Sequence, residues 1–141
     1  MPPTVIVESP LEAYIQKMLN RSEDFRRQCL ALAAQPQVYV RVQMVLYGLP
    51  PSVFAKTDVQ RTSAGPLIAT VRIQPSVNWS EWIGHEFEHI LEQVEGIRLK
   101  DFRQNGSGRW ESSSDMFESL RAITAGREIR RQMGLKRENA N

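Results

Sequence analysis

The chain has 141 residues, of which 18 are lysine or arginine and 16 are aspartate or glutamate, so its formal net charge is +2. A charge balance this even gives no argument for nucleic-acid binding, and no apolar run reaches the roughly 18 residues that a membrane span needs. We therefore expect neither a nucleic acid nor a membrane as a partner. The basic excess near the C-terminus is interpreted as a solvated helix face and tail, formed by Arg127, Arg130, Arg131, Lys136 and Arg137.

The length fits a single domain over residues 1–141, in which we expect residues 1–8 and 134–141 to be frayed. Residues 1–10 have neither a basic n-region nor a long apolar h-region, so we expect no signal peptide there. A cytoplasmic protein and an exported mature form both fit this pattern, and the sequence does not indicate the oligomeric state. Cys29, the only cysteine, excludes an internal disulfide and is interpreted as a small core residue.

Two helices are expected first. The SPLE run at residues 9–12 has the form of a capping box with proline at the first helical position, and apolar residues follow it at helical spacing. Ser22 is a suitable N-cap for a second helix, which should stop before Pro36.

Two strands are expected next. Valine alternates with polar residues over Val38–Tyr47, which predicts a strand with one buried face. Leu67–Ile73 predicts a second strand. The polar stretch Lys56–Pro66 between them ends in Ala-Gly-Pro and is interpreted as a loop.

The C-terminal half is expected to contain two more helices. Asn78 or Ser80 caps the first, which should run to about Glu95. After the irregular segment Arg98–Trp110, the last helix is expected from about Ser114 to Met133. Together these elements predict an α+β fold, in which a small, mainly antiparallel or mixed sheet packs on helices.

The candidate chemistry lies on the helix that contains His85, Glu86 and His89. The two histidines, the only ones in the chain, are four residues apart. At about 100° per residue both imidazoles therefore lie on one face, one turn apart. Two such nitrogens can converge on one metal ion, and Glu86 can take a proton from a metal-bound water. This is the HExxH arrangement, and it predicts a zinc site.

The rest of this helix divides into further faces. Its apolar residues fall within about 100° and predict a core stripe, formed by Ile83, Phe87, Ile90, Leu91 and Val94. The histidines fall roughly opposite that stripe. Glu92 falls on the histidine face, where it is a candidate to accept a histidine N–H. Glu88 and Glu95 are expected to face solvent on a third side.

The third protein ligand must be a carboxylate, a cysteine or absent, because the chain has no third histidine. Glu95 is disfavoured, because a helix that continues through it carries it about 9 Å past His89. Better candidates are Glu111, Asp115 and Glu118. Glu118 shares an expected helix face with Ala122, Ala125 and Ile129, so it would stand at the top of a buried seam; otherwise it faces solvent near a helix N-terminus. Asp115, one turn earlier, could be the ligand itself or could hold a histidine N–H.

On these residues the sequence resembles the gluzincin-type zinc metallopeptidases, in which HExxH is followed on a later helix by a glutamate ligand. It is closer to small bacterial zincin-like domains, which have an HELxHxxE-like helix and then a helix with an FE-x-x-A-x-x-x-G-R pattern. The matching segments are His85–Glu92 and Phe117–Arg127, and the resemblance covers roughly residues 38 to 131. The first motif is specific to zincins, whereas the second is weak alone.

The resemblance implies a minimal zincin-like domain with a general base, Glu86, and with the zinc ligands His85, His89 and Glu118. One departure concerns the thermolysin-like gluzincins, which carry NExxxD, because here Ala122 follows Glu118 at the fourth position. The second carboxylate of that pattern is missing, and Asp115 and Glu92 are the candidates to replace it.

The sequence therefore predicts a zinc-dependent hydrolase, a peptidase with a peptide or protein substrate and no further cofactor. Three protein ligands would leave the fourth metal position to water, as in catalytic zinc sites. The main alternative is a non-catalytic, zinc-dependent peptide-binding or regulatory module. The intact Glu86 argues against it, because metal binding does not require that residue. A structural metal site and a hydrolase of other bonds are further alternatives.

The sequence gives weaker signals for the other parts of the expected substrate cleft. Tyr39, Tyr47 and Arg121 are candidate donors to a developing oxyanion. The strand Leu67–Ile73 is expected to edge the cleft and to pair with an extended peptide, as the comparable strand does in zincins. The loop Asp101–Trp110 could cover the cleft as a lid or be an ordinary connection.

Overall fold

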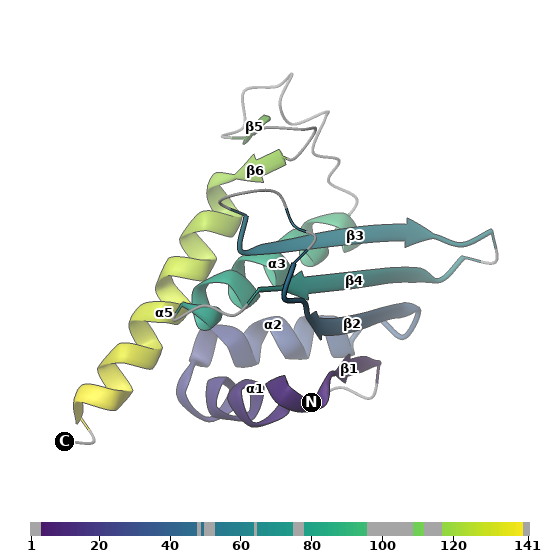
Figure 1. The fold of residues 1–141 in the computed structure, drawn as a ribbon. Coiled ribbons are helices and arrows are strands. Elements are labelled where there is room, and N and C mark those ends of the chain that lie inside the picture. The colour runs from purple at the N-terminus through teal and green to yellow at the C-terminus, as the bar shows by residue number, and fades with distance from the viewer. Residues whose placement is uncertain are drawn as a thin grey trace.

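A four-stranded mixed sheet organises the fold, in the order β1-β2-β4-β3 (Figure 1). The computed structural model describes residues 4–47, 49, 53–63, 65–74, 78–95, 109–111 and 117–139. Three strands are parallel, namely β1 (Val5–Val7), β2 (Val38–Met44) and β4 (Leu67–Ile73). The fourth, β3 (Ala55–Arg61), runs antiparallel to β4 and forms one edge of the sheet.

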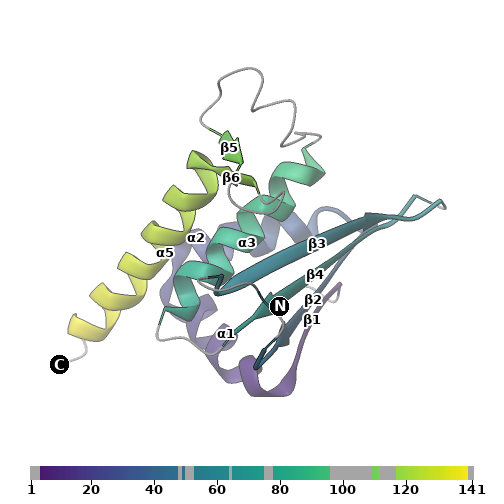
Figure 2. The same cartoon turned by 45° about the horizontal axis from the view of Figure 1, so that its top comes forward.

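Helices cover one face of this sheet. The described residues form α1 (Ser9–Arg21), α2 (Glu23–Ala33), α3 (Trp79–Val94) and α5 (Leu120–Asn139). Figures 1 and 2 show α1, α2 and α3 on the same side of the sheet, with α5 along the flank of α3. A short antiparallel pair, β5 (Arg109–Glu111) and β6 (Phe117–Ser119), comes before α5. The α+β class with a small mixed sheet is thus confirmed.

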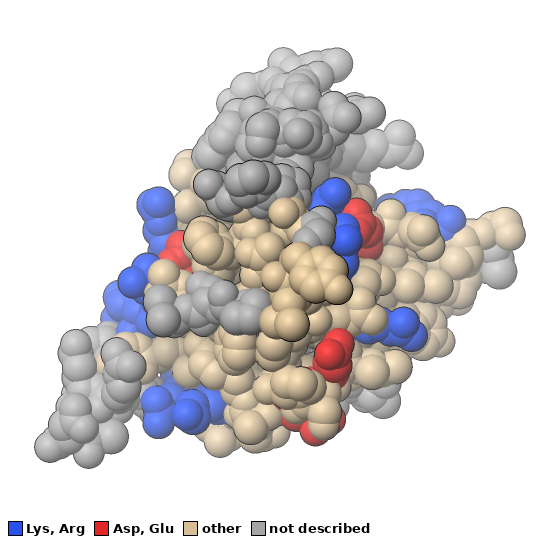
Figure 3. Space-filling view, viewed as in Figure 1, with Lys and Arg blue, Asp and Glu red and all other residues tan. Residues whose placement is uncertain are grey.

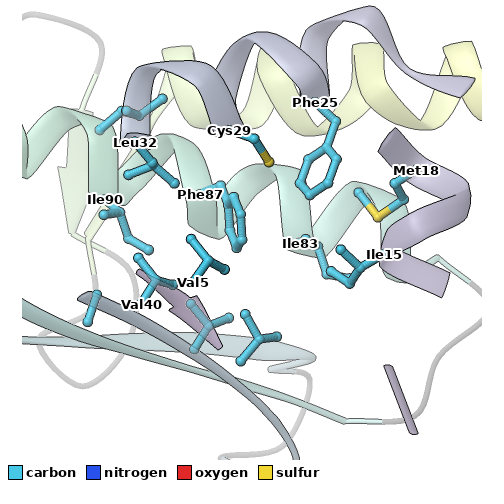
Figure 4. Packing of buried hydrophobic residues seen from close by; sticks show 14 of the residues in the cluster. Val5, Ile15, Met18, Phe25, Cys29, Leu32, Val40, Ile83, Phe87 and Ile90 are labelled. Carbon is cyan, nitrogen blue, oxygen red and sulfur yellow. The ribbon is translucent and has the colours of Figure 1, made fainter. Parts of the chain in front are cut away.

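The core lies between the sheet and helices α1, α2 and α3 (Figure 4). Alternation along β2 buries Val38, Val40 and Val42 on one face of the strand. On α3, Ile83, Phe87 and Ile90 are fully buried, so the expected core stripe is confirmed; Leu91 is 4% exposed and Val94 packs at the margin.

Cys29 belongs to this core, as the sequence predicts. Figure 4 shows it on α2 among Phe25, Leu32 and Phe87. Burial raises the pKa of its thiol to about 12. The thiol is therefore protonated at neutral pH and is suited neither to metal ligation nor to nucleophilic attack.

The two N-terminal helices are confirmed, but only one of their expected caps is. Ser22 caps α2, because its hydroxyl accepts the backbone N–H of Phe25 at 3.0 Å. The capping box at residues 9–12 is wrong. Ser9 is already the first residue of α1, and Glu8 takes the cap position without a side-chain bond.

The interpretation of Lys56–Pro66 as a loop is also wrong over most of its length. Residues 55–61 form the edge strand β3, and only the turn at Thr62–Pro66 remains, with Gly65 at a φ of +110° that favours glycine. An edge strand with one covered face tolerates alternating small and charged residues. The sequence AKTDVQR therefore carries too little apolar signal to mark it.

The boundaries near both termini differ from expectation. Val5–Val7, expected to be frayed, pairs with β2 as β1. The last helix begins at Leu120 instead of about Ser114, because residues 117–119 form β6. It also continues past Gly134 to Asn139. The expected loop Arg98–Trp110 lies outside the described residues except for its last two.

Helices α3 and α5 approach each other closely through glycine. A Cβ on Gly126 would lie 2.5 Å from the carbonyl oxygen of Glu81 and 3.2 Å from the Cβ of His85. A Cβ on Gly84 would lie 2.5 Å from Cδ1 of Ile129. The 2.5 Å separation from backbone at Gly126 is shorter than real Cβ contacts, so a larger residue there would force the two helices apart. At Gly84 the close atom is the end of the Ile129 side chain, which can shift more easily. The buried, small-residue face expected on the last helix is confirmed for Ala122, Ala125 and Ile129.

Replacement of Gly126 tests this contact. Gly126→Ala should destabilise the protein by about 1–3 kcal/mol, because the clash with backbone outweighs the gain of up to about 1 kcal/mol from alanine in a helix. Gly134→Ala, on the same helix, is the matched control, since nothing lies within 4 Å of its added Cβ. Urea midpoints of the two variants should move in opposite directions. A Gly126→Ala protein as stable as wild type would contradict the close packing.

Candidate metal centre

Helix α3 presents His85, Glu86 and His89 as one cluster. One ligand atom from each lies within 4.8 Å of the others, and the two histidine Nε2 atoms are 3.1 Å apart. His85 is 5% exposed and Glu86 7%, and the side chain of His89 is 12% exposed. These residues could therefore hold a metal ion that is largely shielded from bulk water.

The separation of the two imidazoles fits zinc. Zn–N bonds are about 2.0–2.1 Å long, and two of them at a tetrahedral angle place their nitrogens roughly 3.3 Å apart. The observed 3.1 Å is close to that value. Imidazole and carboxylate are also donor types that zinc accepts.

Glu92 holds the ring of His89. Its Oε1 lies 3.2 Å from His89 Nδ1, and an ionised carboxylate can only accept, so the ring hydrogen belongs on Nδ1. In the neutral ring this tautomer leaves a lone pair on Nε2, the atom nearest to His85. Glu92 is 2% exposed, so water competes little for this contact. The structure thus brings Glu92 to the histidine face, where the sequence places it.

Ser119, at the end of β6, contacts Glu92 and is not among the site residues that the sequence predicts. Its hydroxyl donates to Glu92 Oε1 at 2.9 Å and accepts the backbone N–H of Ala122 at 3.0 Å. Ser119 therefore caps α5 and at the same time supports the partner of His89. A serine before a helix is a recognisable signal, but Ser112–Ser114 offers competing caps in the sequence.

Thr57 of β3 holds the carboxylate of Glu86. Its hydroxyl donates to Glu86 Oε1 at 2.7 Å. This contact joins the edge strand to the candidate base on α3. The sequence could not indicate it, because the segment that contains Thr57 reads as a loop.

The structure places the backbone of two candidates for the third ligand, Glu118 and Glu111, but describes no side chain of the three. Glu118 lies in β6, paired with Trp110, and not on the helix, so the helical-face argument for it is wrong. Its backbone nevertheless adjoins Ser119, which reaches the histidine partner Glu92. The side chains of Glu118 and Glu111 lie outside the described part of the chain, and so does the whole of Asp115. Their ligand roles stay predictions.

Glu95 is engaged elsewhere. It is the C-cap residue of α3, and its carboxylate receives Arg121 through both oxygens, Nη1 at 3.1 Å and Nη2 at 2.5 Å. The side chain is 47% exposed, as expected from its position on the helix.

The expectation that Glu88 faces solvent is wrong, because it is 2% exposed. Its Oε1 accepts Gln28 Nε2 at 2.9 Å, and its Oε2 accepts Arg121 Nε at 2.5 Å. Arg27 lies 3.8 Å from the same carboxylate. Glu88 therefore joins α2, α3 and α5, and its polar partners explain how a carboxylate is accommodated at a buried position.

The three candidate oxyanion donors are not brought together. Arg121 is held by Glu95 and Glu88, and these contacts, first that with Glu95, raise its pKa above the usual value. Tyr39 lies on the sheet face opposite to the buried valines of β2 and is 47% exposed. Tyr47 is 85% exposed. Among the described residues, the hydrogen bonds of the histidine cluster involve Thr57 and Glu92 and neither tyrosine.

The strand available to an extended peptide is β3 and not β4. Strand β4 pairs with β2 on one side and with β3 on the other, so both of its edges are occupied and the expectation for Leu67–Ile73 is wrong. Strand β3 has one free edge in the described sheet and touches Glu86 through Thr57. Just before it, Phe54 stacks on Trp82, whose ring lies 6.3 Å from that of His85.

The basic C-terminal face is exposed, as expected. Figure 3 shows lysine and arginine side chains along the side occupied by α5. Arg130 pairs with Glu81 at 3.0 Å and Arg131 pairs with Glu128, while Arg127 is exposed beside them. The side chains of Lys136 and Arg137 lie outside the described residues.

No protein-family model matches the chain, and no curated protein or solved structure is detectably similar to it. Within the described ranges, none of the helices combines the length and the apolar character needed to cross a membrane.

Arg121 tests the network beside the site. Arg121→Ala should destabilise the protein by about 2 kcal/mol, because Glu88 stays buried with fewer partners. The loss should be smaller than for a fully buried pair, since the Arg121 side chain is 39% exposed. Arg131→Ala removes an exposed ion pair on the same helix and should change stability by less than about 0.5 kcal/mol. Equal urea midpoints for the two variants would show that Glu88 does not depend on Arg121.

Proposed function

We propose that the chain is a zinc-dependent hydrolase on a minimal zincin-like fold and that it cleaves peptides. The observation that carries the proposal is the cluster of His85, Glu86 and His89, with the two Nε2 atoms 3.1 Å apart and a buried carboxylate between them in sequence. The contact between His89 and Glu92 supports it, because a carboxylate on the far nitrogen is how metal-binding histidines are commonly held.

In this proposal His85 and His89 bind zinc together with one further carboxylate. Glu118 is the preferred third ligand, because its backbone adjoins the segment that reaches Glu92, whereas Glu95 is paired with Arg121. A bound zinc ion would lower the pKa of a water molecule and polarise a substrate carbonyl. Glu92 and Ser119 would hold the ring of His89 from its Nδ1 side, which would leave Nε2 available to the metal.

Glu86 is the proposed general base. It is 7% exposed and hydrogen-bonded by Thr57 on one oxygen, so its carboxylate is fixed beside the histidines. It would take a proton from the attacking water and deliver it to the leaving amine. The free edge of β3, which carries Thr57, offers main-chain groups that an extended peptide could pair with at this point.

Metal content is the first test. Wild-type protein purified without a metal-affinity tag should contain about one zinc ion per chain, whereas His89→Ala should contain almost none, because one of three ligands is lost. Glu118→Ala should lose zinc and Glu95→Ala should keep it. Mass spectrometry measures all four. A wild-type chain that binds no zinc would overturn the proposal, and zinc retained by Glu118→Ala would exclude that residue as the ligand.

Hydrolysis is tested with a mixture of peptides of random sequence, analysed by mass spectrometry for new termini. Wild type should cleave peptides, and Glu86→Gln should retain zinc while its rate falls by about 10²–10⁴-fold, because a positioned base contributes that much. Zinc binding without cleavage by wild type would favour the alternative, a metal-dependent peptide-binding module. Equal cleavage by the two proteins would exclude Glu86 as the base.

A further inference from the structure

We infer that Ser119, the N-cap of α5, is a positioning residue for the metal centre, and that it sets metal affinity through Glu92 and His89. The inference deepens the proposed function and rests on the proposed metal site. It names a residue outside the HExxH helix and outside the expected ligand set.

A series of three linked contacts, from Ser119 to His85, carries the inference. Ser119 Oγ donates to Glu92 Oε1 at 2.9 Å, and the same oxygen lies 3.2 Å from Nδ1 of His89. His89 Nε2 in turn lies 3.1 Å from Nε2 of His85. A hydroxyl on α5 is therefore connected to the pair of ligand nitrogens through one carboxylate oxygen.

Burial makes this connection effective. Ser119 and Glu92 are each 2% exposed, so water cannot easily replace the hydroxyl if it is removed. A carboxylate that loses one of its donors in a buried place is less firmly held and less well compensated. The contact between Glu92 and His89 would then weaken, and the ring of His89 would be less firmly oriented.

The second bond of Ser119 fixes the hydroxyl itself. Its oxygen accepts the backbone N–H of Ala122 at 3.0 Å, so its hydrogen is available for Glu92. The position of the oxygen is thus set by the first turn of α5. That turn is also held by Arg121, which bonds Glu88 and Glu95 of α3. The start of α5 is therefore docked on α3 at two places, one of which leads to the metal ligands.

Ser22 provides a matched control for the capping role. It is also a buried serine that caps a helix, accepting the N–H of Phe25 at 3.0 Å, and its hydroxyl also donates to a side chain on another helix, Gln132, at 2.5 Å. Within the described part of the chain, the hydroxyl of Ser22 bonds these two residues and not the histidine cluster. Ser22→Ala should therefore reproduce the loss of a cap and of a helix–helix bond without the connection to Glu92.

The experiment measures zinc affinity by competition with a chelator, together with the visible spectrum of the cobalt-substituted protein and the urea midpoint. Ser119→Ala should weaken zinc binding by about 10-fold, the lower end of the effect of losing an outer partner of a metal ligand, and should alter the cobalt spectrum. Ser119→Thr, which keeps the hydroxyl, should restore both. Ser22→Ala should lower the urea midpoint but change zinc affinity by less than about twofold.

A double substitution tests whether Ser119 affects zinc binding through Glu92. When Glu92→Ala is already present, Ser119→Ala should weaken zinc binding by less than about twofold more, because its effect passes through Glu92. Ser119→Gly gives a second way to remove the hydroxyl if Ser119→Ala folds poorly, since glycine is accepted at N-caps at little cost.

The outcomes separate this inference from the proposed function. If wild type binds no zinc, both are overturned. If wild type binds zinc and Ser119→Ala binds it equally well, only the role of Ser119 is overturned. An equal loss of affinity in Ser22→Ala would reduce Ser119 to a structural cap, and a full further loss in the Glu92→Ala background would exclude the route through Glu92.

Discussion

Helix α3 is enclosed on nearly its whole circumference, and each side of it packs against a different element. Ten of its residues are buried. Phe87 faces α2 and the sheet, Gly84 faces α5, and Glu86 faces β3. Because neighbouring side chains on a helix are about 100° apart, the helix cannot rotate to improve one contact without losing another. The packing of the core stripe therefore fixes where the histidines stand relative to β3 and to the start of α5.

Two buried carboxylates complete this arrangement. Glu88 and Glu92 are one turn apart on α3, and each is bonded to a residue at the start of α5, Arg121 and Ser119 respectively. Burial of such groups contributes little net stability, because desolvation offsets the attraction. The close packing between α3 and α5 involves small or apolar residues, which give close approach but little direction, and the other polar link, Arg130 with Glu81, is on an exposed arginine. In this protein, we infer that the carboxylates select which residues of α5 meet which turn of α3.

The sequence predicts the parts of the fold that have a strong period. The core stripe of α3, the strand at Leu67–Ile73 and the buried position of Cys29 are as expected. Edge strand β3 was not foreseen, because its exposed face is charged and its covered face has only alanine, threonine and valine. Strand β1 has three residues, too few for a period to show.

In the candidate site, too, the sequence predicts the residues that lie on one helix and not the residues that other elements bring to it. HExxH places His85, Glu86 and His89 together because their spacing along one helix suffices, and Glu92 follows from the same wheel. Ser119 and Thr57 come from elements whose positions depend on tertiary packing, so no local pattern indicates their contacts with Glu92 and Glu86. The helical wheel places Glu88 on a third face, away from the core stripe and from the histidines, where solvent is expected. Its partners Gln28 and Arg121 come from two other helices, which the wheel of one helix does not show.

The residues that contact α5 and the start of α5 itself are synthesised at different times. Ser22 bonds Gln132 across 110 positions, and Glu92 bonds Ser119 across 27. Since a chain emerges from the ribosome N-terminus first, both histidines appear before the residues that order them. The sheet can pair and α3 can form while His89 still lacks the buried support of Ser119. Translation of residues 93–132 therefore separates the appearance of the two histidines from the completion of their surroundings, which needs the start of α5 to reach Glu92.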